Sequence, residues 1–403
     1  MSEWKEYKLG DISTMKYGKL CPKNTSGTIP IHSGYRVVGY TDQSNCPANT
    51  VIVVARGVGG CGDVKLLKEP VFLTNLSISV SIDSQVCLPL YFYYYHLLNN
   101  LRWLDSGSAQ SQITIEDLKK YTISIPSIAT QHNIASILSS LDEKIAVNKK
   151  ICDNLEAQAQ ALFKHWFVDF APFKDGKFVE SELGLIPEGW RVGTYDEIIQ
   201  DTISGDWGKE KPEGNYTHKV ACIRGCDFQD VKMGLRGKTP ERYILEKNYN
   251  SKHFNDKDVL VEISGGTATV STGRICPVSQ LLIDKYDGDI VCTNFCRLVR
   301  PCIGYSSYLY YSWKYKYDRK VMFGYENGTS GIKNFSIKDF TSREPLIIPK
   351  LSDLHVFEDM IEHIHTHIQN LGSESAKLAT LRDTLLPKLM SGQIIINEIE
   401  KSL

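Results

Sequence analysis

Three glycines in the 403-residue chain stand at a spacing that cofactor sites use. Gly57, Gly59 and Gly62 follow the apolar run VIVVARG, and a G-x-G-x-x-G turn after a strand can cradle a dinucleotide or a methyl donor. Pro70 would cut short any helix after this turn, and no acidic residue follows the next strand at the expected distance. We therefore interpret the glycines as a turn on which Arg56 can approach a phosphate.

Two further enzyme signatures are incomplete. The tripeptide Gly237-Lys238-Thr239 resembles the end of a phosphate-binding loop, but Lys232 occupies the position where that loop needs its first glycine. Among the 15 prolines no two are adjacent, so the Pro-Pro motif of amino-group methyltransferases is absent. We therefore do not expect an enzyme, and we predict no catalytic residue in this chain.

Cysteines and histidines supply candidate metal ligands. Two C-x-x-x-C pairs, Cys222/Cys226 and Cys292/Cys296, fall within the spacing of zinc half-sites. Each pair lies in an apolar, strand-like run, so buried strand thiols explain them better than zinc does. Three histidines alternate along a predicted helix without an acidic or cysteine partner at ligand spacing, and we expect them to face solvent: His363, His365 and His367. We predict no metal site.

Composition is typical of a globular protein with two or three domains, since 42% of the residues are apolar and 23% are charged. No apolar run is long enough to cross a bilayer, and the first residues lack the pattern of a secretory signal. The eleven cysteines therefore indicate reduced thiols rather than a disulfide framework. We expect a cytoplasmic protein that does not bind membranes.

Basic and acidic residues are nearly balanced, 46 against 47, but they are not evenly distributed. Residues 1–124 carry 12 Lys and Arg against 10 Asp and Glu, and residues 190–347 carry 23 against 20. The two remaining segments together carry 11 against 17. This separation permits two weakly basic domains that face an acidic partner such as DNA, although the excesses are small.

The sequence contains an internal repeat. Three matches define it: Trp4 with Trp190, Thr74-Asn75 with Thr293-Asn294, and Ile125-Pro126 with Ile348-Pro349. The offset grows from 186 to 219 before the Thr-Asn pair and only to 223 after it. Nearly all the extra length of the second copy therefore lies in its first half, as is typical of variable loops on a shared scaffold.

Each copy ends in a heptad pattern of apolar positions at alternating spacings of four and three, which predicts a long helix. The first helix carries Ile134, Leu138, Leu141, Ile145, Asn148, Cys152, Leu155, Ala159, Leu162 and Trp166. The second carries Phe357, Ile361, Ile364, Ile368, Leu371, Ser375, Leu378, Arg382, Leu385 and Leu389. Equal length and phase favour pairing of the two helices over packing into a larger bundle, and the Pro- and Gly-containing segment after the first helix lets the chain reverse. At Arg382 the pattern weakens, and Leu381 is the alternative seam residue.

These observations predict an α+β fold with two mixed α/β domains, separated by a pair of long antiparallel coiled-coil helices in a pseudo-two-fold repeat. We expect sheet domains at residues 1–126 and 189–349, because both are rich in β-branched and aromatic runs broken by Gly, Asn and Asp. The remaining segments are a helix at 127–170, a linker at 171–188, a helix at 350–392 and a tail at 393–403.

Both sheet domains contain loops in which basic residues alternate with aromatic ones, as in MKYGKLCPKNTSGTIPIHSGYR and DWGKEKPEGNYTHK. Lys and Arg neutralise phosphates, and Arg, Asn and Gln can read base edges in the major groove. A basic loop alone is usually just a solvated loop, whereas two unequal copies on a spacer favour a bipartite, asymmetric DNA target. The candidate DNA-binding residues are Lys16, Lys19, Lys23, Tyr35, Arg36, Arg56, Gln110, Gln112, Lys209, Lys211, Arg224, Arg236, Thr267, Thr269, Arg274, Lys333 and Asn334.

Four strings carry a resemblance to the DNA specificity subunits of type I restriction-modification systems: LFKHWFVDF at 162–170, LRDTLLPKLMSGQI at 381–394, DWGKE at 206–210 and EISGGTATVSTGR at 262–274. The resemblance extends over essentially the whole chain. It implies two target-recognition domains, each reading half of a split sequence, and helices that dock two methyltransferase subunits and the motor-nuclease subunits. It also implies that the methyl donor, ATP and magnesium belong to those partners and that this chain binds no cofactor. In the first copy ARGVGGCG replaces the fuller SGGTATVSTGR.

We expect the helical pair to bind partner subunits, because aromatic residues near the linker exceed what a two-helix seam can cover. The candidate partner-binding residues are Leu155, Leu162, Phe163, Trp166, Phe167, Leu378, Leu385 and Leu389. Alternative functions are a stand-alone DNA-binding protein, a structural coiled-coil adaptor, or an enzyme in its own right. A DNA mobility shift with and without a methyltransferase separates the first two, and an activity assay on the purified chain tests the third.

Overall fold

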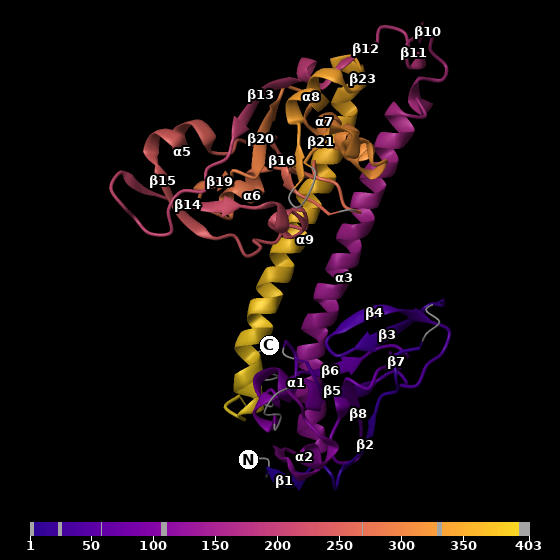
Figure 1. Ribbon diagram of the computed structural model, residues 1–403, viewed down its shortest axis with the longest axis vertical. Coiled ribbons are helices and arrows are strands. Elements are labelled where there is room, and N and C mark those ends of the chain that lie inside the picture. The colour runs from indigo at the N-terminus through magenta and orange to yellow at the C-terminus, as the bar shows by residue number, and fades with distance from the viewer. Residues whose placement is uncertain are drawn as a thin grey trace. The chain divides into compact units, whose positions relative to one another are not determined.

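A computed structural model describes residues 4–22, 26–57, 59–105, 111–267, 269–328 and 333–394 (Figure 1). The chain divides into two compact units. The first contains the described residues up to Lys144 and from Leu378 onward, and the second comprises Ile145–Lys377. Two helices of 40 residues each, α3 (Ile128–Phe167) and α9 (Leu351–Met390), pass from one unit into the other.

The first unit is built on a four-stranded sheet in the order β2-β8-β5-β6 and a three-stranded sheet in the order β4-β3-β7. Strand β5 lies between two neighbours and all its residues are buried, which explains the continuous apolar run TVIVV. The core of the first unit includes Val51, Val53, Tyr91 and Leu138, so the four-stranded sheet packs on α1 and on the start of α3. The elements are β1 (Lys5–Lys8), β2 (Ser13–Tyr17), β3 (Ile29–Ser33), β4 (Arg36–Thr41), β5 (Thr50–Val54), β6 (Val64–Leu67), β7 (Phe72–Leu73), β8 (Ser77–Ile82), α1 (Pro89–Leu98), α2 (Ile115–Lys120) and β9 (Thr122–Ile125), which pairs with β1.

The second unit contains a four-stranded sheet in the order β13-β20-β16-β18 and three-stranded sheets in the orders β15-β14-β19 and β17-β22-β21. Its strands are β10 (Phe178–Ser181), β11 (Gly184–Pro187), β12 (Arg191–Thr194), β13 (Ile199–Ser204), β14 (Tyr216–Ile223), β15 (Glu241–Leu245), β16 (Val259–Glu262), β17 (Ser264–Gly265), β18 (Ile275–Pro277), β19 (Ile290–Cys292), β20 (Cys296–Pro301), β21 (Glu326–Asn327), β22 (Lys333–Phe335) and β23 (Pro345–Ile348). Its helices besides the long pair are α4 (Phe228–Lys232), α5 (Glu246–Lys252), α6 (Gln280–Asp284), α7 (Ser306–Asp318) and α8 (Ile337–Arg343).

The topology confirms the internal repeat. Both four-stranded sheets have the same strand order, with Val51 opposite Val80 in the first unit and Val259 opposite Val299 in the second. The sheets β4-β3-β7 and β15-β14-β19 each contain one parallel pair, β3 with β7 and β14 with β19. The extra length of the second copy lies where the sequence predicts it. Strands β3 and β4 are joined by residues 34–35, whereas a 3-10 turn and α4 lie between β14 and β15.

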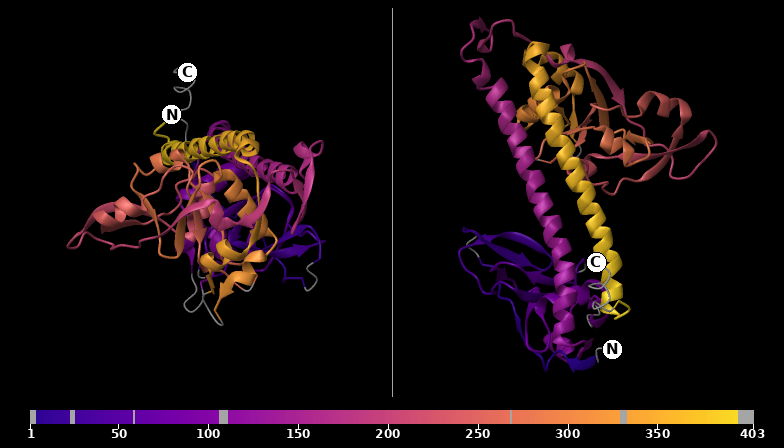
Figure 2. Two further views of the ribbon diagram at one scale, coloured as in Figure 1. Left: turned by 90° about the horizontal axis from the view of Figure 1, so that it is seen from above. Right: turned by 180° about the vertical axis from the view of Figure 1, so that it is seen from behind.

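The two long helices are paired and antiparallel, as the heptad pattern predicts (Figures 1 and 2). In the first unit Asp142 contacts Arg382, and in the second Asn148 contacts Ser375 while the Phe163 ring packs against Phe357. All twenty predicted seam positions are buried or partly buried. The proposed replacement of Arg382 by Leu381 in the seam is wrong, because the Leu381 side chain is 47% exposed.

Polar residues in the seam meet polar partners on the other helix. Asn148 is fully buried, and its Nδ2 donates to Glu374 Oε2 at 2.7 Å and to Ser375 Oγ at 3.3 Å. Arg382 Nη1 lies 2.6 Å from Asp142 Oδ1. A polar pair buried between two helices favours one register, because any slip would leave it unsatisfied.

The linker predicted at 171–188 is not irregular throughout, because β10 and β11 form an antiparallel hairpin with Phe178 opposite Pro187. Phe170 and Phe173 pack edge-on against Trp190. The chain therefore leaves α3 through an ordered aromatic connection. Among the described residues, no helix is long and apolar enough to cross a membrane.

Candidate nucleic-acid interface

In the first unit, three segments that lie far apart in the sequence meet at one backbone junction. The N–H of Ala55 donates to the carbonyl of Leu76 at 2.8 Å, and the N–H of Ile113 donates to the carbonyl of Ala55 at 2.9 Å. Beside this junction an antiparallel bridge joins Arg56 to Gln112. We name residues 56, 74–76 and 112 the first loop site.

The second unit repeats the junction. The N–H of Ile263 donates to the carbonyl of Phe295 at 2.8 Å, and the N–H of Phe335 donates to the carbonyl of Ile263 at 2.8 Å. The neighbouring bridge joins Ser264 of β17 to Asn334 of β22. We name residues 264–267, 269, 293–295 and 333–334 the second loop site. The two loop sites therefore share a backbone frame and differ in side chains.

One glycine packs against the Thr-Asn segment of each loop site. A Cβ atom on Gly18 would lie 2.2 Å from the carbonyl oxygen of Thr74, and a Cβ on Gly205 would lie 2.0 Å from that of Thr293. Side-chain carbons do not approach a backbone oxygen this closely, so both positions require glycine. The Thr-Asn pair that marks the repeat is thus held in the same way in both units.

The glycine-rich segment after β5 is a turn, as predicted. The N–H of Gly62 donates to the carbonyl of Val54, and the N–H of Gly273 donates to the carbonyl of Glu262, each at 2.9 Å. Both glycines have positive φ, 91° and 83°. The segments ARGVGGCG and SGGTATVSTGR therefore begin and end in equivalent hydrogen bonds. They are corresponding segments of the two copies, although their lengths differ.

Several predicted residues of the first unit lie near the first loop site. Lys19 forms a parallel bridge with Thr74, and its carbonyl accepts the N–H of Asn75 at 2.8 Å. The Tyr35 ring lies beside the glycine turn, and the Arg36 guanidinium is 5.9 Å from the centre of that ring.

The other predicted residues of this unit are less closely tied to the junction. Lys16 is exposed on β2, with its carbonyl accepting a hydrogen bond from Ser79. Lys23 and Gln110 lie outside the described residues.

In the second unit, Thr267, Thr269, Lys333 and Asn334 belong to the second loop site. The Thr267 hydroxyl accepts the N–H of Thr269 at 3.2 Å, so the exposed threonines form one tight turn. Asn334 is exposed, whereas the Lys333 ammonium lies 2.9 Å from Glu326.

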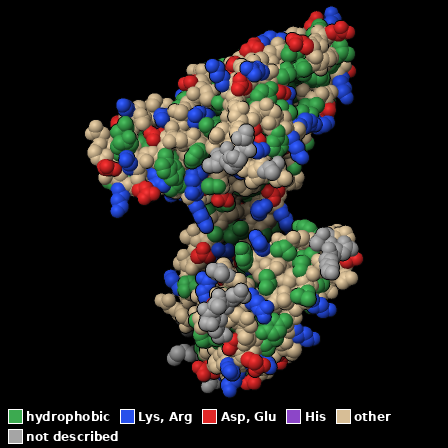
Figure 3. Space-filling model, in the orientation of Figure 1, with side chains coloured by type: hydrophobic (Ala, Val, Ile, Leu, Met, Phe, Trp, Pro, Cys, Tyr) green, Lys and Arg blue, Asp and Glu red, His purple; other side chains and the backbone are tan. Residues whose placement is uncertain are grey.

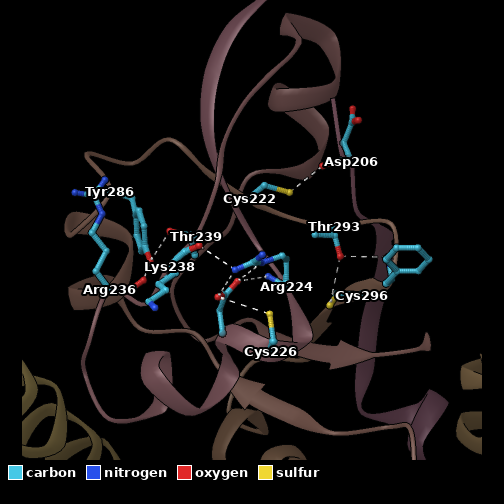
Figure 4. A network of polar contacts seen from close by, with 12 residues as sticks. Asp206, Cys222, Arg224, Cys226, Arg236, Lys238, Thr239, Tyr286, Thr293 and Cys296 are labelled. Carbon is cyan, nitrogen blue, oxygen red and sulfur yellow. Dashed lines mark hydrogen bonds and ion pairs between the residues drawn. The ribbon is translucent and has the colours of Figure 1, made fainter. Parts of the chain in front are cut away.

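Arg224 and Arg274 are each paired with a buried carboxylate of the same unit. The Arg224 guanidinium forms two 2.9 Å bonds with the buried Asp227 carboxylate, at the centre of the network in Figure 4. Arg274 binds the buried Glu262 carboxylate at 2.7 and 2.5 Å. Each pairing raises the pKa of the arginine, because the carboxylate stabilises the charged form. Both arginines therefore hold the protein's own loops, and their contact with DNA stays a prediction.

Two of the other three predicted residues contact residues outside the second loop site. Lys209 bridges to Tyr243 of β15, and Lys211 is exposed in the same connection before β14. The Arg236 guanidinium lies 4.8 Å from the centre of the Tyr286 ring, and Figure 4 shows it on the far side of Arg224 from Thr293. Lys232 is partly buried beside Tyr310, and burial lowers its pKa.

Sequence reasoning missed two exposed residues of the second loop site, Asn294 and Phe295. The signal was present, because the Thr-Asn pair is one of the best internal matches, but it was taken as a repeat marker. The face in Figure 3 mixes basic, acidic and apolar side chains rather than presenting one continuous basic field.

Comparisons with known proteins bear on both sites. The family model described as type I restriction modification DNA specificity domain matches residues 1–157. The type I restriction enzyme MjaIX specificity subunit of Methanocaldococcus jannaschii is 26% identical and is aligned over 98% of this chain and 89% of its own length. The HindI specificity subunit of Haemophilus influenzae is 22% identical over 98% of this chain and all of its own length. Over nearly its whole length the chain is therefore similar to type I specificity subunits, and its residues 1–157 match their family model.

The fold agrees with this family. The crystal structure of the type I restriction-modification S subunit from M. genitalium matches with a TM-score of 0.58 at 19% identity, covering 96% of each chain. The protein is the DNA specificity subunit of a type I system, the non-catalytic part of such an enzyme, whose cofactors are used by other subunits.

Thiols and imidazoles of the specificity subunit are mostly structural. Within the described residues, no group of three or more His, Cys, Asp or Glu could hold a metal ion. Cys222, Cys292 and Cys296 are buried as predicted, but Cys226 is exposed. The prediction that all three helical histidines face solvent is wrong for His365. Its Nε2 lies 2.9 Å from the Tyr311 hydroxyl, and burial lowers its pKa to about 4.

The predicted partner-binding residues are divided between core and surface. Phe163 and Phe167 are each only 4% exposed, because they pack against Tyr308 and Phe357 of the same unit. The inference of an exposed aromatic surface is therefore wrong for these two residues, since the sheet domain covers them. Leu389 is also buried, whereas the remaining candidates are partly exposed: Leu155, Leu162, Trp166, Leu378 and Leu385.

Proposed function

We propose that the two loop sites read the two halves of a bipartite, asymmetric DNA target in the cytoplasm. The observation that carries this proposal is the shared backbone frame with unequal side chains. The first bridge presents Arg56 and Gln112, and the second presents Ser264 and Asn334. Equal frames place side chains equivalently, and unequal side chains read different base edges.

We further propose that the helical pair docks two DNA methyltransferase subunits, and that motor-nuclease subunits complete a restriction enzyme. The methyl donor, ATP and magnesium are bound and used by those partner subunits. The sheet domains are assigned to residues 1–126 and 189–349, and the partly exposed leucines of the helices are the candidate contacts. Replacing Leu155 or Leu378 with Asp should prevent assembly with the methyltransferase, because a buried charge in the seam separates the helices.

The test is to map methylated sites in cells that express this chain with its methyltransferase. Changing Gln112 to Ala should relax specificity in one half of the target, and changing Asn334 to Ala should relax it only in the other. Each lost base contact should cost about 1–3 kcal/mol of discrimination. If either substitution relaxes specificity in both halves of the target, or in neither half, the assignment of one half to each loop site is refuted.

Phosphate contacts have a separate signature. Changing Arg236 or Lys209 to Ala should weaken binding equally on all sequences and lower the salt slope by about one per contact. Binding of DNA by the chain alone, unaffected by methyltransferase, would favour a stand-alone DNA-binding protein. A chain that assembles with methyltransferase but never shifts DNA would be a structural adaptor.

A further inference from the structure

We propose that Phe295 reads the C5-methyl group of a thymine in the half-site of the second unit. The inference rests on the proposed function of the second loop site and names one of its specificity determinants. Phe295 is 61% exposed, although it is one of the largest apolar side chains in that site. An exposed ring inside a recognition loop offers an apolar surface that a bound ligand can cover.

The backbone holds Phe295 rigidly. Its N–H donates to the Thr293 hydroxyl at 3.3 Å, and its carbonyl accepts the N–H of Ile263 at 2.8 Å. The N–H of Thr293 in turn donates to the carbonyl of Ile223 at the end of β14. Because Thr293 and Cys296 are buried while Asn294 and Phe295 are exposed, the turn is anchored at both ends and displays its two central residues. A ring on a turn anchored in this way can contact one base with little loss of conformational entropy.

The setting is polar around the ring. Asn294 precedes it, and the exposed Asn334 belongs to the strand whose Phe335 joins the same junction. The Arg297 guanidinium is held by the carbonyls of Asn294 and Cys296, and the nearby Glu262 carboxylate is neutralised by Arg274. Amide groups beside an apolar surface suit an A·T pair in the major groove, where adenine offers an acceptor and a donor and thymine adds its methyl group.

The first unit has no ring at the position equivalent to Phe295. Leu76 occupies the corresponding place and is partly buried. If the ring served only to hold the shared frame, both units would need it. The difference assigns Phe295 to what the second unit recognises rather than to its fold.

The experiment uses the assembled complex with methyltransferase and duplexes of the mapped target. Each thymine in the half-site of the second unit is replaced singly by deoxyuridine, which lacks only the methyl group. For the wild-type complex, one substitution should weaken binding about four-fold, the factor that corresponds to ~0.8 kcal/mol for one buried methyl-sized group. Phe295→Ala should weaken binding to the unmodified duplex by a similar factor and abolish the effect of that deoxyuridine.

Two controls separate this effect from general damage. Phe295→Leu keeps an apolar contact and should retain part of the thymine preference. Ile303→Ala removes an apolar side chain that is 93% exposed in the same unit but outside the loop site, and it should change nothing. Methylation mapping of Phe295→Ala should show relaxed choice at the same base pair only.

Several results would overturn the inference. These are a half-site without thymine, equal deoxyuridine sensitivity of wild type and Phe295→Ala, or a uniform loss of affinity on every sequence, as expected for a wedge between bases. If wild type binds specifically and Phe295→Ala is indistinguishable from it, only this inference fails. If the wild-type complex shows no sequence preference at all, the proposed function fails with it.

Discussion

The first and second loop sites can be compared residue by residue, because equivalent hydrogen bonds define both. Arg56 and Gln112 form the bridge in the first, and Ser264 and Asn334 form it in the second. Leu76 is replaced by Phe295, while Gly18 and Gly205 keep the same close contact with the Thr-Asn segment. The residues that support the frame are therefore the same or similar, and those that face outward differ. A scaffold of this kind can change its target without changing its fold.

The cores beneath the two sites also differ. In the second unit Glu262 ends β16 and Asp258 precedes it, each buried and paired with an arginine. The equivalent residues of the first unit are Val54 and Thr50, according to the strand registers. The second unit therefore depends on buried charges where the first uses an apolar strand end and a hydroxyl. This difference makes the stabilities of the two units separable by mutation.

The largest effect is expected from Arg300→Met. Both Asp258 oxygens accept bonds from Arg300 at 2.9 Å, and Asp258 is only 1% exposed, so the variant leaves a buried carboxylate without its countercharge. The cost should be about 3–5 kcal/mol in the free energy of unfolding of the second unit. Hydrogen exchange of β16 and β20 measures it, with the first unit as internal reference.

A matched control is Arg343→Met, which removes an exposed ion pair with Asp339 and should cost less than about 1 kcal/mol. The double change of Asp258 and Arg300 to apolar residues should recover much of the loss. Equal exchange in Arg300→Met and wild type would show that the pair is not needed.

Acid should act on the first unit through His96. This side chain is 2% exposed, accepts a bond from the Tyr121 hydroxyl, and has its pKa lowered to about 4 by burial. Since the unfolded value is about 6.5, the unfolded state binds the proton first, and stability falls as pH drops from about 6.5 to 4, by up to about 3 kcal/mol. Thermal unfolding of His96→Gln should depend less on pH across this window. A wild-type midpoint that stays constant from pH 7 to 4 would contradict the assignment.

His218 in the second unit should have the opposite sign. Burial opposes its protonation, but hydrogen bonds at 2.9 Å to Asp289 and 2.7 Å to Glu246 outweigh burial and raise its pKa. Its contribution is therefore fully present below about pH 6.5 and is lost as pH rises through the raised value. In His218→Asn the unfolding midpoint of this unit should lose that decline on the alkaline side, while the first unit is unchanged.

The glycines under the loop sites should show a smaller and symmetric effect. Gly18→Ala and Gly205→Ala place a carbon against a backbone oxygen and should each cost about 1–3 kcal/mol, with loss of recognition in one half-site only. Gly59→Ala and Gly324→Ala are the controls, because a Cβ there meets only ordinary contacts or open space and neither glycine has positive φ. Methylation mapping and hydrogen exchange of the loops read out both effects. Equal tolerance at all four positions would refute the close approach.

The smallest differences are expected in the helical seam. In the first unit Arg382 pairs with Asp142, whereas in the second Asn148 faces Ser375. Arg382→Leu should cost about 1 kcal/mol and lessen the sensitivity of that unit to salt, since the lost partner is charged and partly exposed. Asn148→Leu combined with Ser375→Leu should change stability little while relaxing the helix register. Denaturant unfolding at low and high salt separates the two variants.

Local sequence predicted those features that depend on periodicity. The heptad spacing identified both long helices and all twenty seam positions, because burial of one helix face imposes that period whatever the neighbours are. The offsets between matched residues of the two copies also located the extra length of the second copy. The hairpin at β10 and β11 was missed, since its polar strands lie outside any core and leave no strong alternation.

The loop sites were predicted only in part. Arg56, Gln112 and Asn334 were chosen as polar residues of the repeat, but their pairing depends on strand order, which no local pattern contains. Arg224 and Arg274 looked identical to free arginines in the sequence. Only the fold placed buried carboxylates against them.

By itself, the sequence determined that the chain is a duplicated α+β protein with paired helices and no catalytic signature. Such properties follow from composition and spacing along one chain. The tertiary structure decided which side chains face outward: it buried Phe163 and Phe167, paired two arginines, and left Asn294 and Phe295 exposed. The physical reason is that exposure and pairing depend on contacts between segments tens of residues apart. Those contacts are set by the fold, and no local sequence pattern contains them.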